Sequence, residues 1–199
     1  DQQDKVRLLI DPTSSYAQAA AMAMGRAMDD VIITAASATA FTGETGATST
    51  AAQTAIAAGG AGLTIAKLRT AKQTFDLASV DPSIPRHIVV GPEQITNLLS
   101  TTEVTSSDFN TVKALVQGEI DSFLGFKFTV SNRLAKSGND RTCLAFAQDG
   151  ITLAIGKDVS ARIDERADKS YATQVYYCQS IGATRMEEAK VLGIVCQEA

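Results

Sequence analysis

The C-terminal part of the chain carries the clearest pattern of apolar and polar positions. Residues 173–180 alternate in character, and residues 191–195 form a short, mostly apolar run. Alternation with a period of two is typical of a half-buried β-strand, and a short apolar run is typical of a buried one. We predict that these two strands pair as a long ribbon. Four charged residues occupy the break between them, where we expect exposure to water: Arg185, Glu187, Glu188 and Lys190.

A second pattern, with spacings of three and four, marks residues 64–79 as the clearest helix. Its apolar stripe consists of Ile65, Leu68, Ala71, Phe75 and Ala78, as expected for an amphipathic helix. Thr64 is a suitable N-cap residue, and Asp81-Pro82 ends the helix. The other side is predicted to face solvent and carries Lys67, Arg69, Lys72, Gln73 and Asp76.

The remaining chain alternates between short helices, short strands and turns. Helices are predicted to begin at Thr13 or Ser14, after Gly91-Pro92 and at Ser107, where capping or first-turn residues stand. Strands are predicted at 6–10, 87–90, 142–146, 151–155 and 159–163, and within 119–130 on both sides of a turn at Gly125. Residues 31–40 fit either a strand or a continued helix. The segment 42–62, rich in Gly, Ala, Thr and Ser, is predicted to be a surface loop with a short helix at its centre.

The order of these elements predicts an α+β fold in two parts. The middle of the chain, about 85–155, mixes helices with short strands, whereas the flanks 63–82 and 156–197 supply one long helix and long strands. Such segregation along the chain favours two packed parts over regular βαβ repetition. We expect the middle part to be inserted between the two pieces of the other.

Composition narrows the class of protein. The 199 residues include 45% apolar and 20% charged residues, with a net charge of −4, which is typical of a globular protein. Nucleic-acid-binding proteins normally carry a basic patch, and none is visible, so binding driven by DNA or RNA sequence is not expected. No apolar run approaches the roughly 18 residues of a membrane span. Because the chain opens at Asp1 inside a strand-like pattern, we expect a longer natural product, with an artificial boundary as the alternative.

Residue types that carry catalysis are present without the spacing that catalysis needs. His87 is the only histidine, and no serine lies in a GxSxG motif, so no catalytic triad is indicated. The glycines within 59–62 lack the lysine and the preceding strand of a phosphate loop. Cys143, Cys178 and Cys196 have no CxxC spacing, so we expect buried free cysteines. The sequence therefore predicts no enzyme activity, no metal site and no cofactor.

Charges of alternating sign mark the surface that we expect to contact other subunits. Acidic residues interleaved with basic ones do not form a cage for a hard cation. A single exposed ion pair contributes about 0–1 kcal/mol, but a pattern repeated over many contacts sets register between subunits. A solvated strand end is the alternative interpretation. The hypothesis assigns seven residues to such contacts: Arg162, Asp164, Glu165, Arg166, Arg185, Glu187 and Glu188.

Four segments resemble the major capsid proteins of tailed bacteriophages. Residues 106–128 (SSDFNTVKALVQGEIDSFLGFKF) resemble a central segment of these proteins. Residues 150–191 resemble their C-terminal part, in which YATQVY, IGATRMEE and KV occur in this order. Residues 63–76 (LTIAKLRTAKQTFD) match the place of their long spine helix, and residues 5–32 are similar to the end of their extended loop and the helix after it. The similarity covers nearly the whole chain.

The resemblance implies the tailed-phage major capsid fold, an α+β fold with axial and peripheral domains, a long spine helix and long β-ribbons. In this assignment residues 1–12 end the extended loop, 13–82 and 156–199 form the peripheral domain with the spine helix at 64–79, and 83–155 form the axial domain. It also implies self-assembly as pentamers and hexamers into an icosahedral shell around packaged double-stranded DNA. The shell would be assembled in the host cytoplasm and found in the virion. Scaffold, portal and decoration proteins are implied partners; a membrane and sequence-specific DNA contacts are not.

Three alternatives stay open at this point, each with its own signature. An encapsulin-like nanocompartment shell would enclose protein cargo instead of DNA. A small α/β enzyme would have a deep polar pocket near His87 with a perturbed pKa. A phage head-decoration or tail protein would assemble as rings or tubes rather than as a closed shell.

Overall fold

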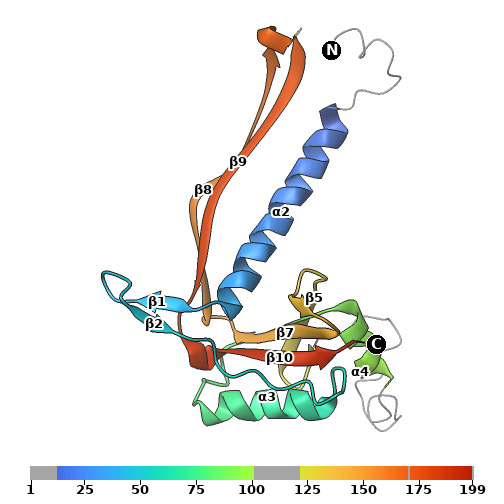
Figure 1. Ribbon diagram of the computed structural model, residues 1–199, viewed down its shortest axis with the longest axis vertical. Coiled ribbons are helices and arrows are strands. Elements are labelled where there is room, and N and C mark those ends of the chain that lie inside the picture. The colour runs from blue at the N-terminus through green and yellow to red at the C-terminus, as the bar shows by residue number, and fades with distance from the viewer. Residues whose placement is uncertain (1–12, 101–121, 170, 199) are drawn as a thin grey trace. The chain divides into compact units, whose positions relative to one another are not determined.

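The computed structural model describes residues 13–100, 122–169 and 171–198 and divides the chain into two compact units (Figure 1). Unit 1 consists of Asp1–Ile32 and Leu153–Ala183, and unit 2 consists of Ile33–Thr152 and Thr184–Ala199. The predicted strand at 6–10, the predicted helix from Ser107 and the loop assigned to 1–12 lie outside the described residues.

Unit 1 is built from one helix and one β-ribbon. Helix α2 (Thr13–Ser37) starts at the predicted position and continues through the ambiguous residues 31–37 into unit 2. Strands β8 (Ile151–Arg166) and β9 (Ala172–Arg185) form a two-stranded sheet, with the 3-10 helix η1 (Ala167–Lys169) between them. The strands predicted at 151–155 and 159–163 are therefore one continuous strand. The Tyr177 hydroxyl donates to the Ala17 carbonyl at 3.1 Å and links the ribbon to the helix.

The predicted pairing of residues 173–180 with residues 191–195 is wrong. Strand β9 pairs with β8, whereas β10 (Val191–Gln197) pairs antiparallel with β7 (Asp140–Ala147) in unit 2. The physical reason lies in the two patterns. The apolar run of β10 needs cover on both faces, which a central sheet supplies, while the alternating run of β9 tolerates one wet face.

Unit 2 is organised around a sheet that contains β10, β7 and four further strands: β3 (Arg86–Val90), β4 (Ser122–Phe123), β5 (Phe126–Val130) and β6 (Lys136–Ser137). Their order is β10-β7-β3-β5-β4, with β6 also paired to β7. Strand β3 is parallel to β5, and the other neighbours are antiparallel. The predicted strand at 87–90 and the turn at Gly125, where φ is +85°, are confirmed.

The segment 42–62 contains a hairpin instead of the predicted central helix. Strands β1 (Ala40–Thr42) and β2 (Thr48–Thr50) pair antiparallel, and Gly43 and Gly46 adopt positive φ in the connection. Further along, the Ile56 amide donates to the Gly193 carbonyl and the Ile56 carbonyl accepts from the Val195 amide, both at 2.9 Å. Ile56 therefore supplies backbone partners to β10, a long-range role that local composition does not reveal.

Two short helices of unit 2 match the sequence pattern closely. Helix α3 (Ile65–Leu77) is capped by Thr64, whose hydroxyl accepts from the Lys67 amide at 3.3 Å, and its stripe of Leu68, Ala71 and Phe75 is buried. Helix α4 (Pro92–Leu99) begins with proline in its first turn, as predicted. The solvent-facing position predicted for Lys67 is wrong, because this residue is only 9% exposed.

The hydrophobic core lies in unit 2. Among the described residues, the buried apolar side chains come from α3, α4, the central sheet and the segments beside them, and include Leu63, Leu68, Phe75, Ile88, Val90, Leu98, Phe126, Cys143, Leu192 and Ile194. Phe75 and Phe126 meet with ring centroids 6.0 Å apart, which joins α3 to the sheet.

Two helices, α2 and α3, can be compared with the long spine helix that the sequence predicts at residues 64–79. Helix α2 has 25 residues and α3 has 13. The long strands β8 and β9 fall largely in unit 1 with α2, while α3 lies wholly in unit 2. The longest described helix is therefore α2, and the helix predicted as the spine at 64–79 is the shorter one.

Candidate functional site

Arg185 is the predicted contact residue whose position differs most from expectation. It is 4% exposed rather than wet. Its guanidinium donates to the carbonyls of Ala36 at 3.0 Å and Ala38 at 2.8 Å through Nη1, and to the carbonyl of Thr50 at 3.0 Å through Nη2. Arg185 therefore joins the end of α2 to both ends of the β1–β2 hairpin.

These contacts satisfy a backbone carbonyl at the C-terminal end of α2. The last carbonyls of a helix lack intrahelical partners and carry partial negative charge. Helix α2 has no basic residue in its own last turn, so Arg185 supplies the positive charge and the donors from a distant strand. Its role inside this chain is structural, whereas its predicted role at a subunit contact stays a prediction.

The four predicted contact residues of β8 are exposed at the end of the β8–β9 ribbon. Arg162, Asp164 and Glu165 all face solvent. Arg166 donates through Nε to Asp168 Oδ1 at 2.9 Å, with a second contact between Nη2 and Oδ2, and this pair lowers the pKa of Asp168. The alternating charges are thus available on the surface, and one basic residue is already paired within the chain.

Glu187 and Glu188 remain exposed beside a lysine that is paired within the chain. Lys190 Nζ lies 2.7 Å from Asp149 Oδ2 and 3.1 Å from Glu187 Oε2. Glu188 opens the 3-10 helix η2 (Glu188–Lys190), which leads into β10. In the charged break, Glu187 and Glu188 are therefore exposed to solvent, as predicted, whereas Arg185 is buried.

A buried ionic cluster surrounds Glu198, and the sequence pattern does not predict it. Glu198 is 3% exposed and accepts hydrogen bonds from Arg141, Lys136 and Gln94, the last at 3.1 Å. These donors, Arg141 foremost, lower the pKa of Glu198 to about 2. Nothing in the local sequence signals the cluster, because its members come from α4, β6, β7 and the segment after β10.

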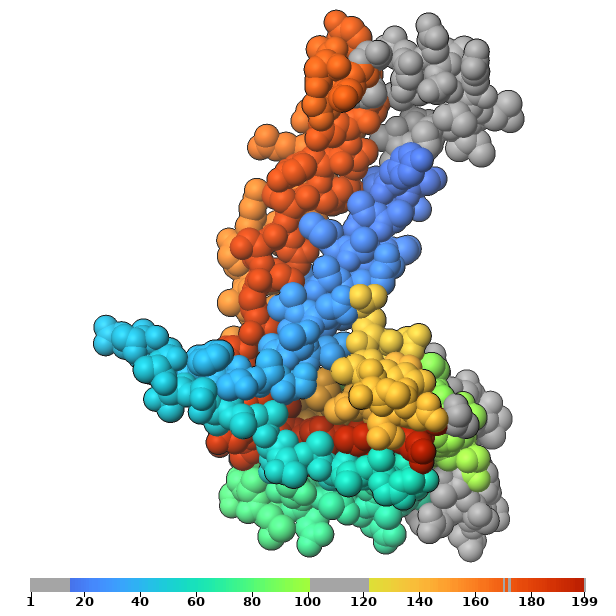
Figure 2. Space-filling view, viewed as in Figure 1, coloured from blue at the N-terminus to red at the C-terminus, as the bar shows by residue number. Residues whose placement is uncertain are grey.

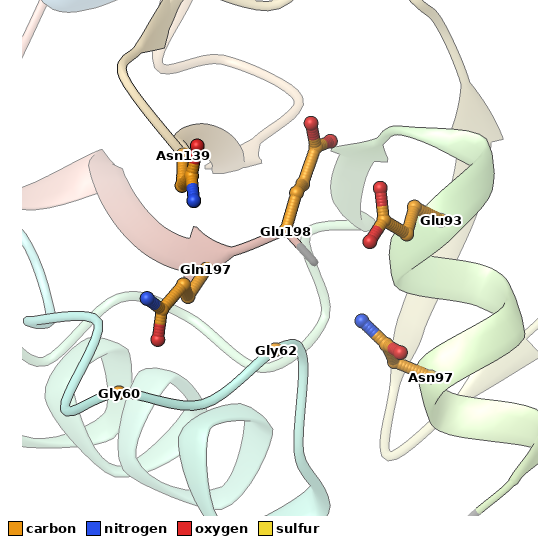
Figure 3. Close-up of a pocket in the computed structure, with 7 residues that line it drawn as sticks. All are labelled: Gly60, Gly62, Glu93, Asn97, Asn139, Gln197 and Glu198. Atoms are coloured by element: carbon orange, nitrogen blue, oxygen red, sulfur yellow. The ribbon is translucent and has the colours of Figure 1, made fainter.

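Glu198 also lines an open polar pocket of about 340 Å³ in unit 2 (Figure 3). Asn97 from α4 and Gln197 from β10 flank it, and Gly60 and Gly62 belong to the loop beneath them. Further lining side chains are Glu93 and Asn139. Because basic partners keep Glu198 ionised, this residue is not a proton donor. His87 is not among the residues that line the pocket. The pocket therefore does not match the enzyme alternative, which expects a polar pocket near His87.

The glycine-rich loop before α3 faces a cation, not an anion. Lys67 Nζ donates to the carbonyls of Ala61 at 2.7 Å, Gly62 at 2.9 Å and Val195 at 3.0 Å. A phosphate loop presents backbone N–H groups to its ligand, whereas here two loop carbonyls and one carbonyl of β10 converge on an ammonium group. The interpretation of this segment as a structural loop agrees with this geometry.

His87 and the cysteines occupy structural positions. His87 lies in β3, inside the sheet rather than at its edge, and stacks on Phe146 with ring centroids 5.7 Å apart. Burial and the nearby Lys127 lower the pKa of His87. Cys143 and Cys196 are buried and free, as expected, while Cys178 is half-buried with its Sγ 2.9 Å from Ser160 Oγ.

Within residues 13–100, 122–169 and 171–198, no group of three or more His, Cys, Asp or Glu residues is arranged to hold a metal ion. No helix in these same ranges has the length and apolarity to cross a membrane.

Comparison with known proteins decides the family. The sequence matches the family model described as "Phage capsid protein" over residues 1–198. The chain belongs to the phage capsid protein family. Among curated proteins, none matches the sequence. As a phage capsid protein, the chain is a structural component of the virion and not an enzyme.

Solved structures agree with this fold. A chain from Mycobacterium phage Che8 is similar with a TM-score of 0.71 at 20% identity, covering 98% of this capsid protein and 66% of that chain. A chain from the capsid of cyanophage P-SCSP1u has a TM-score of 0.70 at 16% identity, covering 98% and 69%. A chain from the asymmetric unit of the cyanophage Pam1 capsid has a TM-score of 0.72 at 14% identity, covering 100% and 72%. This capsid protein thus spans about two thirds of the length of the solved chains.

The similarity confirms the tailed-phage capsid fold and association of copies into a shell. At these sequence identities, the similarity does not assign a role to any individual residue. The seven predicted contact residues and the limits of the axial and peripheral domains stay predictions.

Proposed function

We propose that this capsid protein is the repeating subunit of an icosahedral phage head, in which pentamers and hexamers surround packaged double-stranded DNA. The observation that carries the proposal is the family match over residues 1–198, together with a fold similar to solved capsid chains along 98–100% of its length. Assembly would take place in the host cytoplasm, with scaffold, portal and decoration proteins as further partners.

In this proposal unit 1 corresponds to the peripheral domain and unit 2 to the axial domain. Unit 1 combines the longest described helix, α2, with the long strands β8 and β9. Unit 2 contains the central sheet and the core. The N-terminal piece of the peripheral domain would then end near Ile32 and be shorter than the predicted 13–82. Helix α2 would be the spine helix.

The proposed subunit contacts use the exposed charges of two segments. Arg162, Asp164, Glu165 and Arg166 lie at the end of β8, and Glu187 and Glu188 lie before β10. Complementary charges at the edge of an interface determine the register between subunits and their association rate more than their binding affinity. Arg185 is set apart in the proposal, since its guanidinium is already satisfied within its own chain.

Enclosure of DNA without sequence-specific binding fits the charge balance. The chain carries 18 basic and 22 acidic residues, and contact with phosphates would favour a basic surface. A wall that does not attract DNA requires that another component of the particle drives packaging.

Electron microscopy of particles from the native context, combined with a nuclease-protection assay, tests this function. Closed angular shells that hold nuclease-protected DNA are the expected result. Empty or protein-filled shells would favour the encapsulin-like alternative, rings or tubes would favour a tail or decoration protein, and a uniform monomer would contradict shell assembly.

A further inference from the structure

Cys143 and Cys196 form a pair of buried thiols on the core side of the central sheet. Strands β7 and β10 pair antiparallel, with Cys143 opposite Ile194 and Cys196 opposite Arg141. Directly opposite side chains share one face of a sheet, and so do side chains two positions apart on a strand. Cys196 therefore lies diagonally across from Cys143, on the face of Ile194, and all three side chains are 0% exposed. The register of the sheet creates a dithiol that the sequence spacing does not signal.

The two thiols contact each other and have polar neighbours. The hydrogen bond between them raises the pKa of Cys143 and lowers the pKa of Cys196. The backbone amide of Gly91, the N-cap residue of α4, donates to the sulfur of Cys143. The charge of Lys67 also lowers the pKa of Cys196. The two sulfurs therefore lie together in a place from which water is excluded, with a positive charge nearby.

Lys67 places its ammonium group beside this pair. Its Nζ donates to the carbonyl of Val195, one position before Cys196, at 3.0 Å, and the residue is 9% exposed. The carbonyls of Ala61 and Gly62 also hold it there. Figure 2 shows β10, in red, with the cyan and teal segment that leads into α3 lying against it. A buried cation held by neutral carbonyls favours an anion close by.

The diagonal arrangement favours a bridging ion over a disulfide. Diagonal neighbours in an antiparallel pair lie about 7–8 Å apart, whereas a disulfide needs Cα atoms about 4.4–6.8 Å apart. Two metal–thiolate bonds of about 2.3 Å each let an ion span about 4.6 Å between sulfurs. Zinc takes four ligands, and the described part of the chain has no group of three or more His, Cys, Asp or Glu residues arranged for it. Monovalent copper is soft, prefers thiolates and is satisfied by two of them in line.

We propose that Cys143 and Cys196 bind one soft monovalent metal ion of the Cu(I) class in a buried two-coordinate site, with Lys67 offsetting its charge. Binding forms two copper–sulfur bonds and releases both thiol protons to solvent, with no change of oxidation state. The copper bis-thiolate carries one net negative charge, which the ammonium group balances. The ion would join β10, the end strand of the sheet, to β7. The inference concerns a single chain and does not depend on shell assembly.

Anaerobic titration of the full chain with Cu(I), in competition with a chromophoric Cu(I) chelator, tests the site. The reference protein is Cys178→Ser, which removes the thiol of unit 1 and keeps the buried pair. This protein is expected to take up one Cu(I) per chain, and copper X-ray absorption should then show two sulfur neighbours. Absence of uptake by Cys178→Ser, or copper with only oxygen and nitrogen neighbours, would overturn the proposal.

Variants of the pair itself give the matched comparison. Cys143→Ser and Cys196→Ser should each lower the Cu(I) affinity at least about a hundredfold relative to Cys178→Ser, because losing a ligand costs more than the roughly 10–100-fold loss that follows removal of a ligand's hydrogen-bond partner. The urea midpoint without copper shows whether each variant is folded. Cu(I) should raise the midpoint of Cys178→Ser but not that of a folded pair variant. Unchanged affinity in a folded pair variant would contradict the site, and if neither variant folds, uptake by Cys178→Ser still decides.

Discussion

Arg185 Nη1 lies 3.0 Å from the carbonyl oxygen of Ala36, across 149 positions of sequence. This hydrogen bond places a positive charge at the end of α2, where helix carbonyls lack partners. It changes the meaning of a residue that its sequence neighbourhood marks as a surface charge. Replacing Arg185 should damage the fold of the subunit before it affects any contact between subunits.

We expect Arg185→Met to lower the free energy of unfolding by about 3 kcal/mol or more, since hydrogen bonds to charged groups contribute about 1.5–3 kcal/mol each. Arg185→Lys should lose less, because it keeps the charge but not the forked geometry. Urea denaturation of dissociated subunits measures both. Arg162→Met, at an exposed position, is the matched control and should change stability by less than about 0.5 kcal/mol. Equal stability of Arg185→Met and the control would show that the carbonyl contacts are energetically unimportant.

Glu198 should make the stability of unit 2 sensitive to acid. Its pKa falls from an ordinary value of 4.5 to about 2 in the folded chain, chiefly through Arg141 and then Lys136. A carboxylate with a lowered folded pKa stabilises fully above its unfolded pKa and loses this contribution as pH falls towards the folded pKa. The window therefore runs from about pH 4.5 down to about 2.

The contrast between wild type and Glu198→Gln isolates this contribution. At pH 7 the variant should be less stable by about 1–2 kcal/mol, reduced from the full pKa difference because Lys136 remains partly in water. The gap should close as the pH falls through the window. Chemical denaturation at a series of pH values measures it. A stability difference that stays constant from pH 7 to pH 3 would contradict the ionic role of Glu198.

The sequence pattern was sufficient where local chemistry decides the structure. Helix α3 follows its apolar stripe and its Thr64 cap, α4 starts at Gly91-Pro92, and the strand at 87–90 is present. In each case neighbours within a few residues supply the capping group, the turn or the apolar face. The overall capsid fold could be predicted because long motifs resembled a known family.

The pattern was insufficient where distant segments decide. The choice of β8 over β10 as the partner of β9 depends on which strands the core of unit 2 recruits. Arg185 and Glu198 are charged residues in a polar neighbourhood, and their burial depends on partners up to 149 residues away. No periodicity in a single segment carries that information.

Lys67 offers a second test of a buried cation, with a matched control on the same helix. Its ammonium group donates to three carbonyls, whereas Lys72 is 46% exposed and pairs with Asp76 at 3.0 Å. Lys67→Met should destabilise the subunit by about 2–4 kcal/mol, because buried carbonyls are left without a donor. Lys72→Met should cost less than about 0.5 kcal/mol. Similar urea midpoints for the two variants would contradict the anchoring role of Lys67.

Two glycines should respond in opposite directions to alanine. Gly25 lies inside α2, and a Cβ built there meets nothing within 4 Å. Gly25→Ala should stabilise α2 by about 0.5–1 kcal/mol through higher helix propensity. At Gly150 a Cβ would lie 2.9 Å from the Lys190 carbonyl oxygen and 3.1 Å from that of Ala147. Backbone atoms cannot swing away as a flexible side chain can, so Gly150→Ala should destabilise by about 1–3 kcal/mol.

The glycine pair also separates the two units by experiment. Because α2 lies mostly in unit 1, Gly25→Ala should slow amide exchange in α2 without moving the urea transition of the unit 2 core. Gly150→Ala should lower that transition. A Gly25→Ala variant that weakens shell formation would mean that a neighbouring copy packs against the open space at Gly25, and would place part of the subunit contact on this face of α2.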